Sequence, residues 1–329
     1  MSQFLDAVIT AAQAARQRIV LPEGHDERTI EAARLCAERG IADVIVLSDD
    51  PDLSIPGVRV IDHLTSPDRD RYAQALAKLR EKKGLTLEGA YALLDDELYY
   101  GVMMVKRGDA DGMASGACLP TGDVLRPALQ IIKCASGESM ESWFFEITVP
   151  GCSYGENGTF FFADCGLNTY PTAEGLATIA VQTARSWRSL MGSEPRVALL
   201  SYSSMGSADD EHTQLVREAV RLAHEKAPEL AVDGELQFDA AVVPSVAASK
   251  APGSEVAGRA NVLVFPNLDA GNIGYKIAQR LGLAEAIGPV LQGLAAPVND
   301  LSRGCSAQDI VGMVALSALQ ARHIKEARV

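Results

Sequence analysis

The chain has 329 residues, and its 43 Asp and Glu outnumber its 30 Lys and Arg, which gives a formal net charge of −13. Hydrophobic residues make up 47% of the chain and charged residues 22%, enough apolar surface to bury a core and to exclude intrinsic disorder as the main state. The acidic balance argues against nucleic-acid binding, which needs basic surface. No apolar run approaches the ~18 residues of a membrane span, so we expect neither a nucleic acid nor a membrane as a partner.

The N-terminus and the cysteines indicate a cytoplasmic protein. In the opening run MSQFLDAVITAAQAARQR the basic residues follow the apolar stretch, the reverse of a signal peptide. The six cysteines form no CxxC pair, and the five histidines form no HExxH motif. We therefore expect reduced thiols, no metal site and a cytoplasmic location. Cys152 and Cys305 lie in glycine-rich loops, but no histidine is near either of them in the sequence.

Short apolar runs alternate with amphipathic segments in the first part of the chain. Ser66-Pro67 predicts a helix start, because serine caps free N–H groups and proline suits a first helical turn. The alternation of strands and helices favours a parallel sheet covered by helices. The expected elements are a helix over 2–16, a strand over 18–21, a helix over 26–39, a strand over 44–47 and a helix over 66–84.

The middle of the chain changes character. The runs WFFEITV at 143–149 and TFFFA at 159–163 are rich in strand formers and flank a turn-rich loop over 151–158. The alternation of helices and strands then resumes. The further expected elements are a helix over 173–191, a strand over 197–200, a helix over 209–226, a strand over 262–265, a helix over 271–281 and a C-terminal helix from 306 onward.

The composition shift near residues 138–150 indicates a domain boundary, and we expect a second boundary near 285–295. We therefore expect a discontinuous first α/β domain over 1–140 and 290–329, and a second α/β domain over 141–289. A C-terminus that returns to the first domain would place a cleft between the two domains. Ligands commonly bind in such clefts.

The segment 299–309 (NDLSRGCSAQD) has two interpretations. Ser306-x-x-Asp309 is the pattern of a capping box, in which a carboxylate also complements the helix dipole. Alternatively, Arg303 and the helix N-terminus bind a phosphate or an oxyanion, with Asp309 as a base in the same pocket. The two interpretations are compatible, because a capping carboxylate can also act as a base.

Other polar positions have a functional and a simpler interpretation. The loop 201–207 (SYSSMGS) follows a strand and suits a phosphate, but ordinary loop chemistry also explains it. Lys250 lies in a loop where it can neutralise an anion or be solvated. Arg126 precedes a proline, where a salt bridge to an acidic neighbour would account for it. Arg80 near a helix C-terminus is favoured by the dipole alone, and Tyr275-Lys276 lies inside a helix.

Three runs stand out together: NDLSRGC at 299–305, SKAPGSEVAGRAN at 249–261 and FPNLDAGNIGYKIAQRL at 265–281. With LPEGHDERT at 21–29 and ADGMASGA at 110–117, they resemble the phosphate acetyltransferase (phosphotransacetylase) family. The resemblance extends from the first strand to the last helix. It implies a two-domain isocitrate/isopropylmalate dehydrogenase-like α/β fold, of mostly parallel sheets with helices on both faces.

The resemblance also implies an activity. The chain would transfer an acetyl group between acetyl phosphate and coenzyme A in a ternary complex, as a homodimer, with coenzyme A as a substrate and no tightly bound cofactor. Arg303 would bind the phosphate and stabilise charge on the acetyl carbonyl, Ser302 would hydrogen-bond the reacting group, and Asp309 would take the thiol proton. The positions expected to help bind the substrates are Arg80, Arg126, Lys250, Tyr275, Lys276 and Asn299.

One segment departs from the family pattern. Where the family commonly has a histidine and a hydroxyl-rich stretch, this chain has CLPTG at 118–122. A phosphate acyltransferase that prefers propionyl or butyryl groups is therefore an alternative. An oxidoreductase of the same fold is another, although no GxGxxG follows the first strand. A coenzyme A-binding protein without activity is a third, against which the intact Ser302, Arg303 and Asp309 argue.

Overall fold

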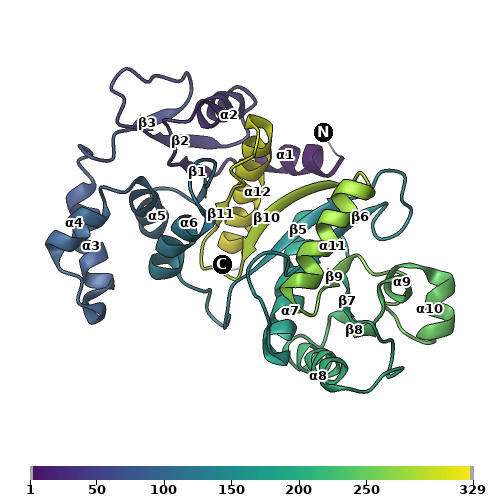
Figure 1. Cartoon of the computed structure of the whole chain (residues 1–329). Helices are drawn as coiled ribbons and strands as arrows, with labels where there is room; N and C mark the ends of the chain where they lie inside the picture. Colours follow the sequence, from purple (N-terminus) through teal and green to yellow (C-terminus); the bar gives the residue numbers. More distant parts are fainter. Residues whose placement is uncertain (1–2, 327–329) are drawn as a thin grey trace. The chain divides into compact units, whose positions relative to one another are not determined.

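The computed structural model describes residues 3–326, which divide into two compact units (Figure 1). The first unit combines residues 3–136 with the C-terminal residues from 294 onward, and the second comprises residues 137–293. The expected domains and the cleft between them stay a prediction. Residues 1–2 and 327–329 of the expected first domain, and residue 2 of its first expected helix, lie outside the described residues.

A five-stranded parallel sheet forms the centre of the first unit, in the order β11-β4-β1-β2-β3. Ile19 of β1 pairs with Val44 on one side and with Gly112 on the other. Because every strand runs in the same direction, the segments that follow β1, β4 and β11 meet at one edge of the sheet. The strands are β1 (Arg18–Leu21), β2 (Asp43–Leu47), β3 (Arg59–Ile61), β4 (Gly112–Ser115) and β11 (Val298–Asp300).

Helices cover this sheet (Figure 1). The C-terminal helix α12 (Ala307–Glu326) is buried along most of its length. It packs against α1, α2 and β4. Its apolar run thus provides the surface that joins the returning C-terminus to the first unit. The other helical segments of this unit are α1 (Gln3–Ala15), α2 (Glu27–Glu38), α3 (Arg69–Leu79), η1 (Glu81–Lys83), α4 (Leu87–Leu93), α5 (Glu97–Arg107), α6 (Thr121–Pro127) and η2 (Ala128–Ile132). No helix within residues 3–326 is long and apolar enough to cross a bilayer.

The helix expected over 66–84 is shorter than predicted. Ser66 accepts bonds from the Asp68 and Arg69 N–H groups, through its hydroxyl and its carbonyl respectively, so the serine forms a turn before the helix. The helix α3 ends at Leu79, and a separate 3₁₀ turn leads to Gly84. The glycine adopts a φ of +77°, which explains why the chain changes direction there.

The second unit contains a six-stranded mixed sheet in the order β10-β5-β6-β9-β7-β8. The pairs β10–β5 and β5–β6 are antiparallel, whereas β6–β9, β9–β7 and β7–β8 are parallel. The strands are β5 (Ser142–Thr148), β6 (Thr159–Ala163), β7 (Arg196–Leu200), β8 (Ala231–Leu236), β9 (Val262–Val264) and β10 (Glu285–Gln292).

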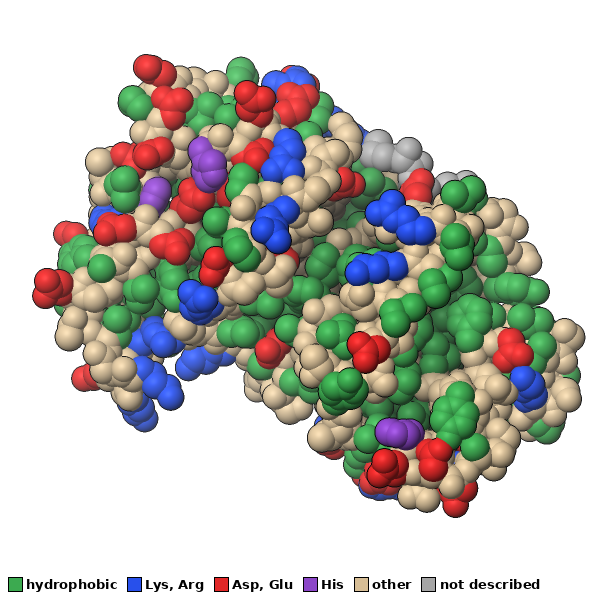
Figure 2. Space-filling view, viewed as in Figure 1, with side chains coloured by type: hydrophobic (Ala, Val, Ile, Leu, Met, Phe, Trp, Pro, Cys, Tyr) green, Lys and Arg blue, Asp and Glu red, His purple; other side chains and the backbone are tan. Residues whose placement is uncertain are grey.

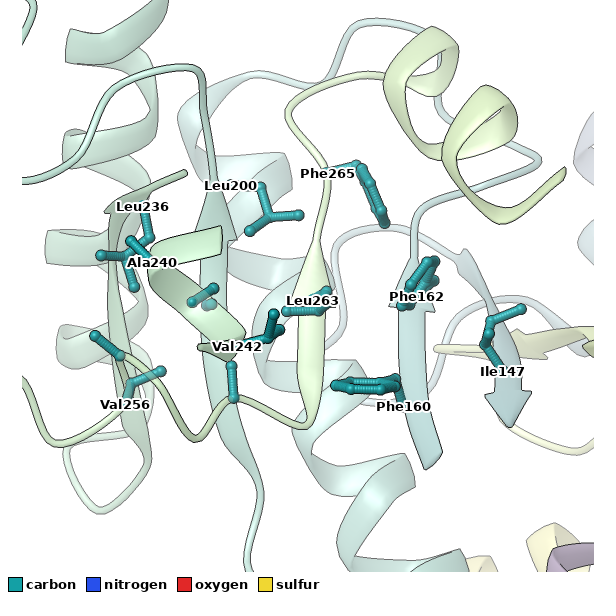
Figure 3. Packing of buried hydrophobic residues seen from close by; sticks show 14 of the residues in the cluster. Ile147, Phe160, Phe162, Leu200, Leu236, Ala240, Val242, Val256, Leu263 and Phe265 are labelled. Atoms are coloured by element: carbon teal, nitrogen blue, oxygen red, sulfur yellow. The ribbon is translucent and has the colours of Figure 1, made fainter. Parts of the chain in front are cut away.

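Side chains alternate across this second sheet, which allows helices to pack on both faces. On one face Phe160 and Phe162 join Phe265 in an apolar cluster (Figure 3). On the other face Phe161 stands edge-on to Trp187 of α7, with ring centroids 4.9 Å apart. The expected α/β class, with mostly parallel sheets and helices on both faces, is confirmed.

Three helices of the second unit, α7, α8 and α11, begin at residues whose side chains cap them. Thr172 caps α7, Asp210 caps α8, and Asn267 caps α11 by accepting a bond of 3.0 Å from the Ala270 N–H. The Asn267 cap explains why α11 begins at Leu268, ahead of the predicted start at Gly271. The helices are α7 (Ala173–Met191), α8 (Glu211–Lys226), α9 (Phe238–Val242), α10 (Pro244–Lys250) and α11 (Leu268–Leu281).

Candidate active site

Three segments meet at the carboxyl edge of the sheet in the first unit. Residues 23–28 follow β1, residues 116–121 follow β4, and residues 301–309 follow β11. Parallel α/β sheets commonly bind their ligands at this edge. Hydrogen bonds between the segments hold them together, and these bonds define the candidate site.

Glu23 organises the segment after β4. Its carboxylate is 1% exposed and accepts bonds from three consecutive backbone N–H groups, those of Gly116, Ala117 and Cys118, at 2.9, 3.0 and 2.8 Å. A loop of this kind would otherwise suit an anionic ligand. Because the carboxylate of Glu23 already bonds to these three N–H groups, Glu23 rather than a ligand holds the shape of the loop.

The guanidinium of Arg28 joins all three segments. Its Nε and Nη2 donate to the two carboxylate oxygens of Asp26, at 3.0 and 2.8 Å. Its remaining bonds go to the backbone carbonyls of Arg303, Cys305 and Ala117, at 2.9, 2.9 and 2.8 Å. The planar five-donor group of arginine suits such a junction. Arg28 therefore fixes the backbone on both sides of Gly304.

Burial sets the protonation state of the two thiols beside Arg28. The Arg28 guanidinium, more than any other neighbour, holds the pKa of Asp26 well below the ordinary carboxyl range. Burial, and next the bond to Asp26, raises the pKa of the Cys118 thiol to about 12. Burial likewise raises the pKa of Cys305. Both thiols are therefore protonated near neutral pH, which argues against either as a nucleophile.

Ser302 and Arg303 lie exposed in the turn between β11 and α12. The Ser302 hydroxyl accepts a bond of 3.3 Å from the Gly304 N–H. Within residues 3–326, the Arg303 guanidinium forms no hydrogen bond or ion pair, although its backbone carbonyl is held by Arg28. The structure therefore combines a fixed backbone with a free cation at this position.

The capping box predicted at the start of α12 is confirmed. Asp309 Oδ2 accepts bonds from the backbone N–H and the hydroxyl of Ser306, both at 2.8 Å, and the Asp309 N–H donates to the Ser306 hydroxyl at 3.2 Å. The second carboxylate oxygen, Oδ1, has no partner among the described residues. One oxygen therefore caps the helix while the other is available to a ligand.

Asn299 is directed away from this edge. The side chain is fully buried, and its amide donates to Ser317 and Gln320 of α12, at 2.9 and 2.7 Å. Its expected part in substrate binding stays a prediction. The placement supports an indirect part, in which Asn299 anchors the end of β11 to α12.

Arg80 and Arg126, far apart in the sequence, both lie within electrostatic reach of Tyr99 in the first unit. Burial raises the pKa of Tyr99, and the positive charges of Arg126 and Arg80 both oppose that shift. Arg126 pairs with Asp123 at 3.2 Å on an exposed face of α6, as the simpler interpretation of the sequence predicts. Such an exposed pair contributes about 0–1 kcal/mol and can readily exchange for another anion.

A cavity of about 360 Å³ lies beside Arg126. Burial, followed by the charges of Glu23, Asp96 and Asp49, raises the pKa of Glu97 in its wall to about 8. The concentration of carboxyl groups disfavours a phosphate inside the cavity. Its other acidic lining residues are Asp95 and Asp123, and Leu119 of the divergent segment also contributes to the wall.

Three predicted substrate-binding residues lie in the second unit. Lys250 ends α10, and its ammonium donates to Gln237 and Asp239 at 2.9 and 3.0 Å. Tyr275 of α11 stacks on Phe145 with ring centroids 4.2 Å apart, while Lys276 beside it is exposed. Their expected parts in holding a substrate stay predictions.

The hydroxyl-rich loop over 201–207 uses its hydroxyls internally. Ser203 is fully buried and donates to Glu235 at 2.7 Å, and its oxygen accepts from the Ala208 N–H at 3.0 Å. The Ser204 hydroxyl accepts from the Gln237 N–H at 2.9 Å. These bonds favour the simpler interpretation, in which the serines shape the loop rather than face a phosphate.

The sequence reasoning missed Glu23, Asp26 and Arg28 as members of the site. A signal was present, because all three follow a strand of a predicted parallel sheet, at the edge where ligands bind. Among residues 3–326 no group of three or more His, Cys, Asp or Glu side chains is arranged to hold a metal ion.

Comparison with known proteins gives a consistent picture. The model of a family described as phosphate acetyl/butaryl transferase matches residues 3–318. A phosphate acetyltransferase of Acetivibrio thermocellus is 54% identical over 329 residues, which cover 98% of this chain and 99% of that protein. The solved structure of the EutD phosphotransacetylase from Staphylococcus aureus has a TM-score of 0.90 and 44% identity, and covers 97% of this chain and 98% of that one.

A more distant structure shares the fold alone. A putative 4-hydroxythreonine-4-phosphate dehydrogenase from Salmonella typhimurium has a TM-score of 0.51 at 16% identity, over 93% of this chain and 99% of that one. The likeness supports the dehydrogenase-like architecture that the family resemblance implies. It carries no implication for the chemistry of this chain.

The bonds of Arg28 predict a local effect of its replacement. Arg28→Met removes three bonds to backbone carbonyls, so the amides of residues 116–118 and 303–306 should exchange with deuterium about tenfold faster or more, since hydrogen bonds to charged groups contribute ~1.5–3 kcal/mol. Arg34→Met is the matched control, because Arg34 lies on the same helix and pairs with two surface carboxylates, Glu31 and Glu38. Equal exchange in the two variants would contradict the role of Arg28.

Proposed function

Because this chain belongs to the phosphate acetyl/butaryl transferase family, we propose that it transfers an acetyl group between acetyl phosphate and coenzyme A within a ternary complex. One observation supports the mechanism: within residues 3–326 the Arg303 guanidinium and Asp309 Oδ1 have no partner, and they lie on the short stretch from the β11–α12 turn to the first turn of α12. Arg28 and the capping box hold that turn in place. A cation and a base fixed together suit acyl transfer to a thiol.

The reaction proceeds in one displacement at the carbonyl carbon. The thiol of coenzyme A gives its proton to Asp309, and the sulfur forms a bond to the carbonyl carbon of acetyl phosphate. The bond from that carbon to the bridging phosphate oxygen breaks, and the phosphate leaves with the electron pair and takes up the proton from Asp309. Arg303 stabilises the negative charge on the carbonyl oxygen and the phosphate, and Ser302 hydrogen-bonds the reacting group. No covalent enzyme intermediate is needed, because orientation of two bound substrates supplies much of the rate.

The remaining predicted residues hold the substrates, which are polyanions. Arg80, Arg126, Lys250 and Lys276 supply positive charge, and the ring of Tyr275 supplies an apolar contact for coenzyme A. The ion pairs of Arg126 with Asp123 and of Lys250 with Asp239 are exposed, so a phosphate can displace the carboxylate at little cost. Coenzyme A is a substrate here, and the proposed chemistry uses no tightly bound cofactor.

A preference for longer acyl groups is the second candidate. The observation that favours it is Leu119, which is half-buried and lines the cavity beside Arg126. An apolar side chain at that position would accept the extra methylene groups of propionyl or butyryl phosphate. Each buried methylene contributes about 0.8 kcal/mol.

The assay that tests the proposed function measures thioester formation from coenzyme A and acetyl, propionyl or butyryl phosphate. We expect acetyl phosphate to give the highest kcat/KM, with one phosphate released for each thioester formed. Faster turnover with the longer acyl phosphates would replace acetyl transfer with the second candidate. A chain that forms thioester from none of them would contradict the proposed function altogether.

One substitution separates the two proposed roles of Asp309, which are those of helix cap and of base. Asp309→Asn keeps an oxygen to cap the helix, so the free energy of unfolding should change by less than about 1 kcal/mol. It loses the base, so kcat should fall by roughly 10²–10⁴. Asp70→Asn, at an exposed carboxylate in the first turn of α3, is the control and should keep full activity. Wild-type kcat in Asp309→Asn would leave that residue as a cap only.

We further propose that the enzyme is a cytoplasmic homodimer. All six cysteines are free thiols, which suits a reducing compartment. Ile273, Ile277 and Leu281 of α11 form an apolar row and are 57%, 53% and 80% exposed. Figure 2 shows hydrophobic side chains gathered over this helix. Exposed apolar patches commonly mark interaction sites, and the occupant proposed here is α11 of a second copy.

A charged side chain in the apolar row of α11 should prevent dimer formation. We expect the wild-type chain to have a mass by light scattering near twice its 35.0 kDa, and Ile277→Glu to have a mass near 35.0 kDa. Burying an unpaired carboxylate in an apolar interface costs several kcal/mol, which accounts for the loss. Leu87→Glu, on α4 and 46% exposed, should remain dimeric. A wild-type monomer, or a dimeric Ile277→Glu, would contradict the proposed interface.

A further inference from the structure

Asp300 is a buried carboxyl group for which the proposed mechanism has no use. It ends β11 and is 2% exposed, directly before the turn that carries Ser302 and Arg303. The Leu301 N–H after it donates to Ser115 of β4 at 2.7 Å, so the backbone here belongs to the sheet edge. Burying a carboxyl group costs free energy. We therefore expect Asp300 to have a role that offsets this cost.

One oxygen of Asp300 reaches the start of α6. Its Oδ2 accepts a bond of 2.6 Å from the hydroxyl of Thr121, the first residue of that helix. The preceding residue, Pro120, provides no side-chain cap. The bond from Thr121 is therefore a direct polar link between α6, whose last turn carries Arg126, and the end of β11.

The other oxygen of Asp300 is buried and has no hydrogen-bond partner among residues 3–326. A Cβ at Gly116 would lie 2.4 Å from this oxygen, and Gly116 has a φ of +113°, so the sheet edge closes tightly around it. Burial, reinforced by the charge of Glu23, raises the pKa of Asp300 to about 6, while the Thr121 bond opposes that shift. The carboxyl group is thus buried at a desolvation cost, and within residues 3–326 the Thr121 hydroxyl is its side-chain hydrogen-bond partner.

We propose that Asp300 is a positioning residue for acetyl transfer, and that its bond to Thr121 sets α6 and Arg126 in register with the turn that carries Ser302 and Arg303. The proposal rests on the proposed function. Asp300 touches neither substrate in this role. It fixes the distance between a group that holds coenzyme A and the groups that act on the acetyl carbonyl.

The test removes the link without removing the carboxyl group. Thr121→Val has nearly the same shape and no hydroxyl, so kcat should fall about tenfold or more while the KM for coenzyme A rises, as expected when a bond to a charged group is lost. Thr121→Ser retains the donor and should restore both constants. Thr148→Val is the matched control, because that hydroxyl also donates to a fully buried carboxyl, that of Glu146 in the second unit. It should lose stability and keep its kinetic constants.

Hydrogen exchange provides a measurement that does not depend on turnover. The amides of residues 301–304 should exchange faster in Thr121→Val than in the wild-type chain or in Thr121→Ser. Unchanged kinetics and unchanged exchange in Thr121→Val would contradict the proposal for Asp300. A wild-type chain without acetyl transfer would contradict the proposed function instead, and accelerated exchange in Thr121→Val would then still support the link between α6 and β11.

Discussion

The guanidinium of Arg28 is the contact on which the geometry of the site depends. Three segments leave the sheet edge without regular structure, and their carbonyls would face water or one another without a common donor. Arg28 donates to carbonyls of two of these segments and pairs with a carboxylate in its own segment, Asp26. The bidentate pair fixes the plane of the guanidinium and leaves its other donors aimed at the backbone. A lysine at this position would be a single point charge and would lack the planar fork.

Arg28 and Arg303, which both lie at this edge of the sheet, have opposite surroundings. Arg28 is satisfied by a carboxylate and by the backbone, whereas the side chain of Arg303 has no partner within residues 3–326. In a chain with a net charge of −13, the Arg303 guanidinium stays unpaired only if neighbouring carboxylates bond elsewhere. The nearest carboxylates on either side in the sequence, Asp300 and Asp309, bond to Thr121 and Ser306 respectively. Within residues 3–326 Arg303 and Asp309 form no ion pair with each other, as their proposed roles of cation and base require.

Local patterns in the sequence were sufficient where a neighbour in the chain decides the structure. The capping box at Ser306 and Asp309, and the helix over 173–191, depend on residues within a few turns, and both were predicted. The start of α11 was placed too late because Asn267 was not considered as a cap. The burial of Asn299 depends on Ser317 and Gln320, which only tertiary packing brings beside β11. The hydrogen bonds of Arg28 depend on three strands being in register. The sequence could therefore indicate the sheet edge at which Arg28 lies, but not the groups that Arg28 bonds.

The most direct measurement is a double-mutant cycle on kcat/KM for acetyl transfer, with Arg28→Met, Arg303→Ala and the combination. If Arg28 acts by holding the backbone of Arg303, its loss costs little once the Arg303 side chain is gone, so the effects of the two substitutions should be far from additive. We expect the double variant to be about as active as Arg303→Ala alone. Additive losses of free energy in the double variant would show that Arg28 acts independently of Arg303 and would contradict this arrangement of the site.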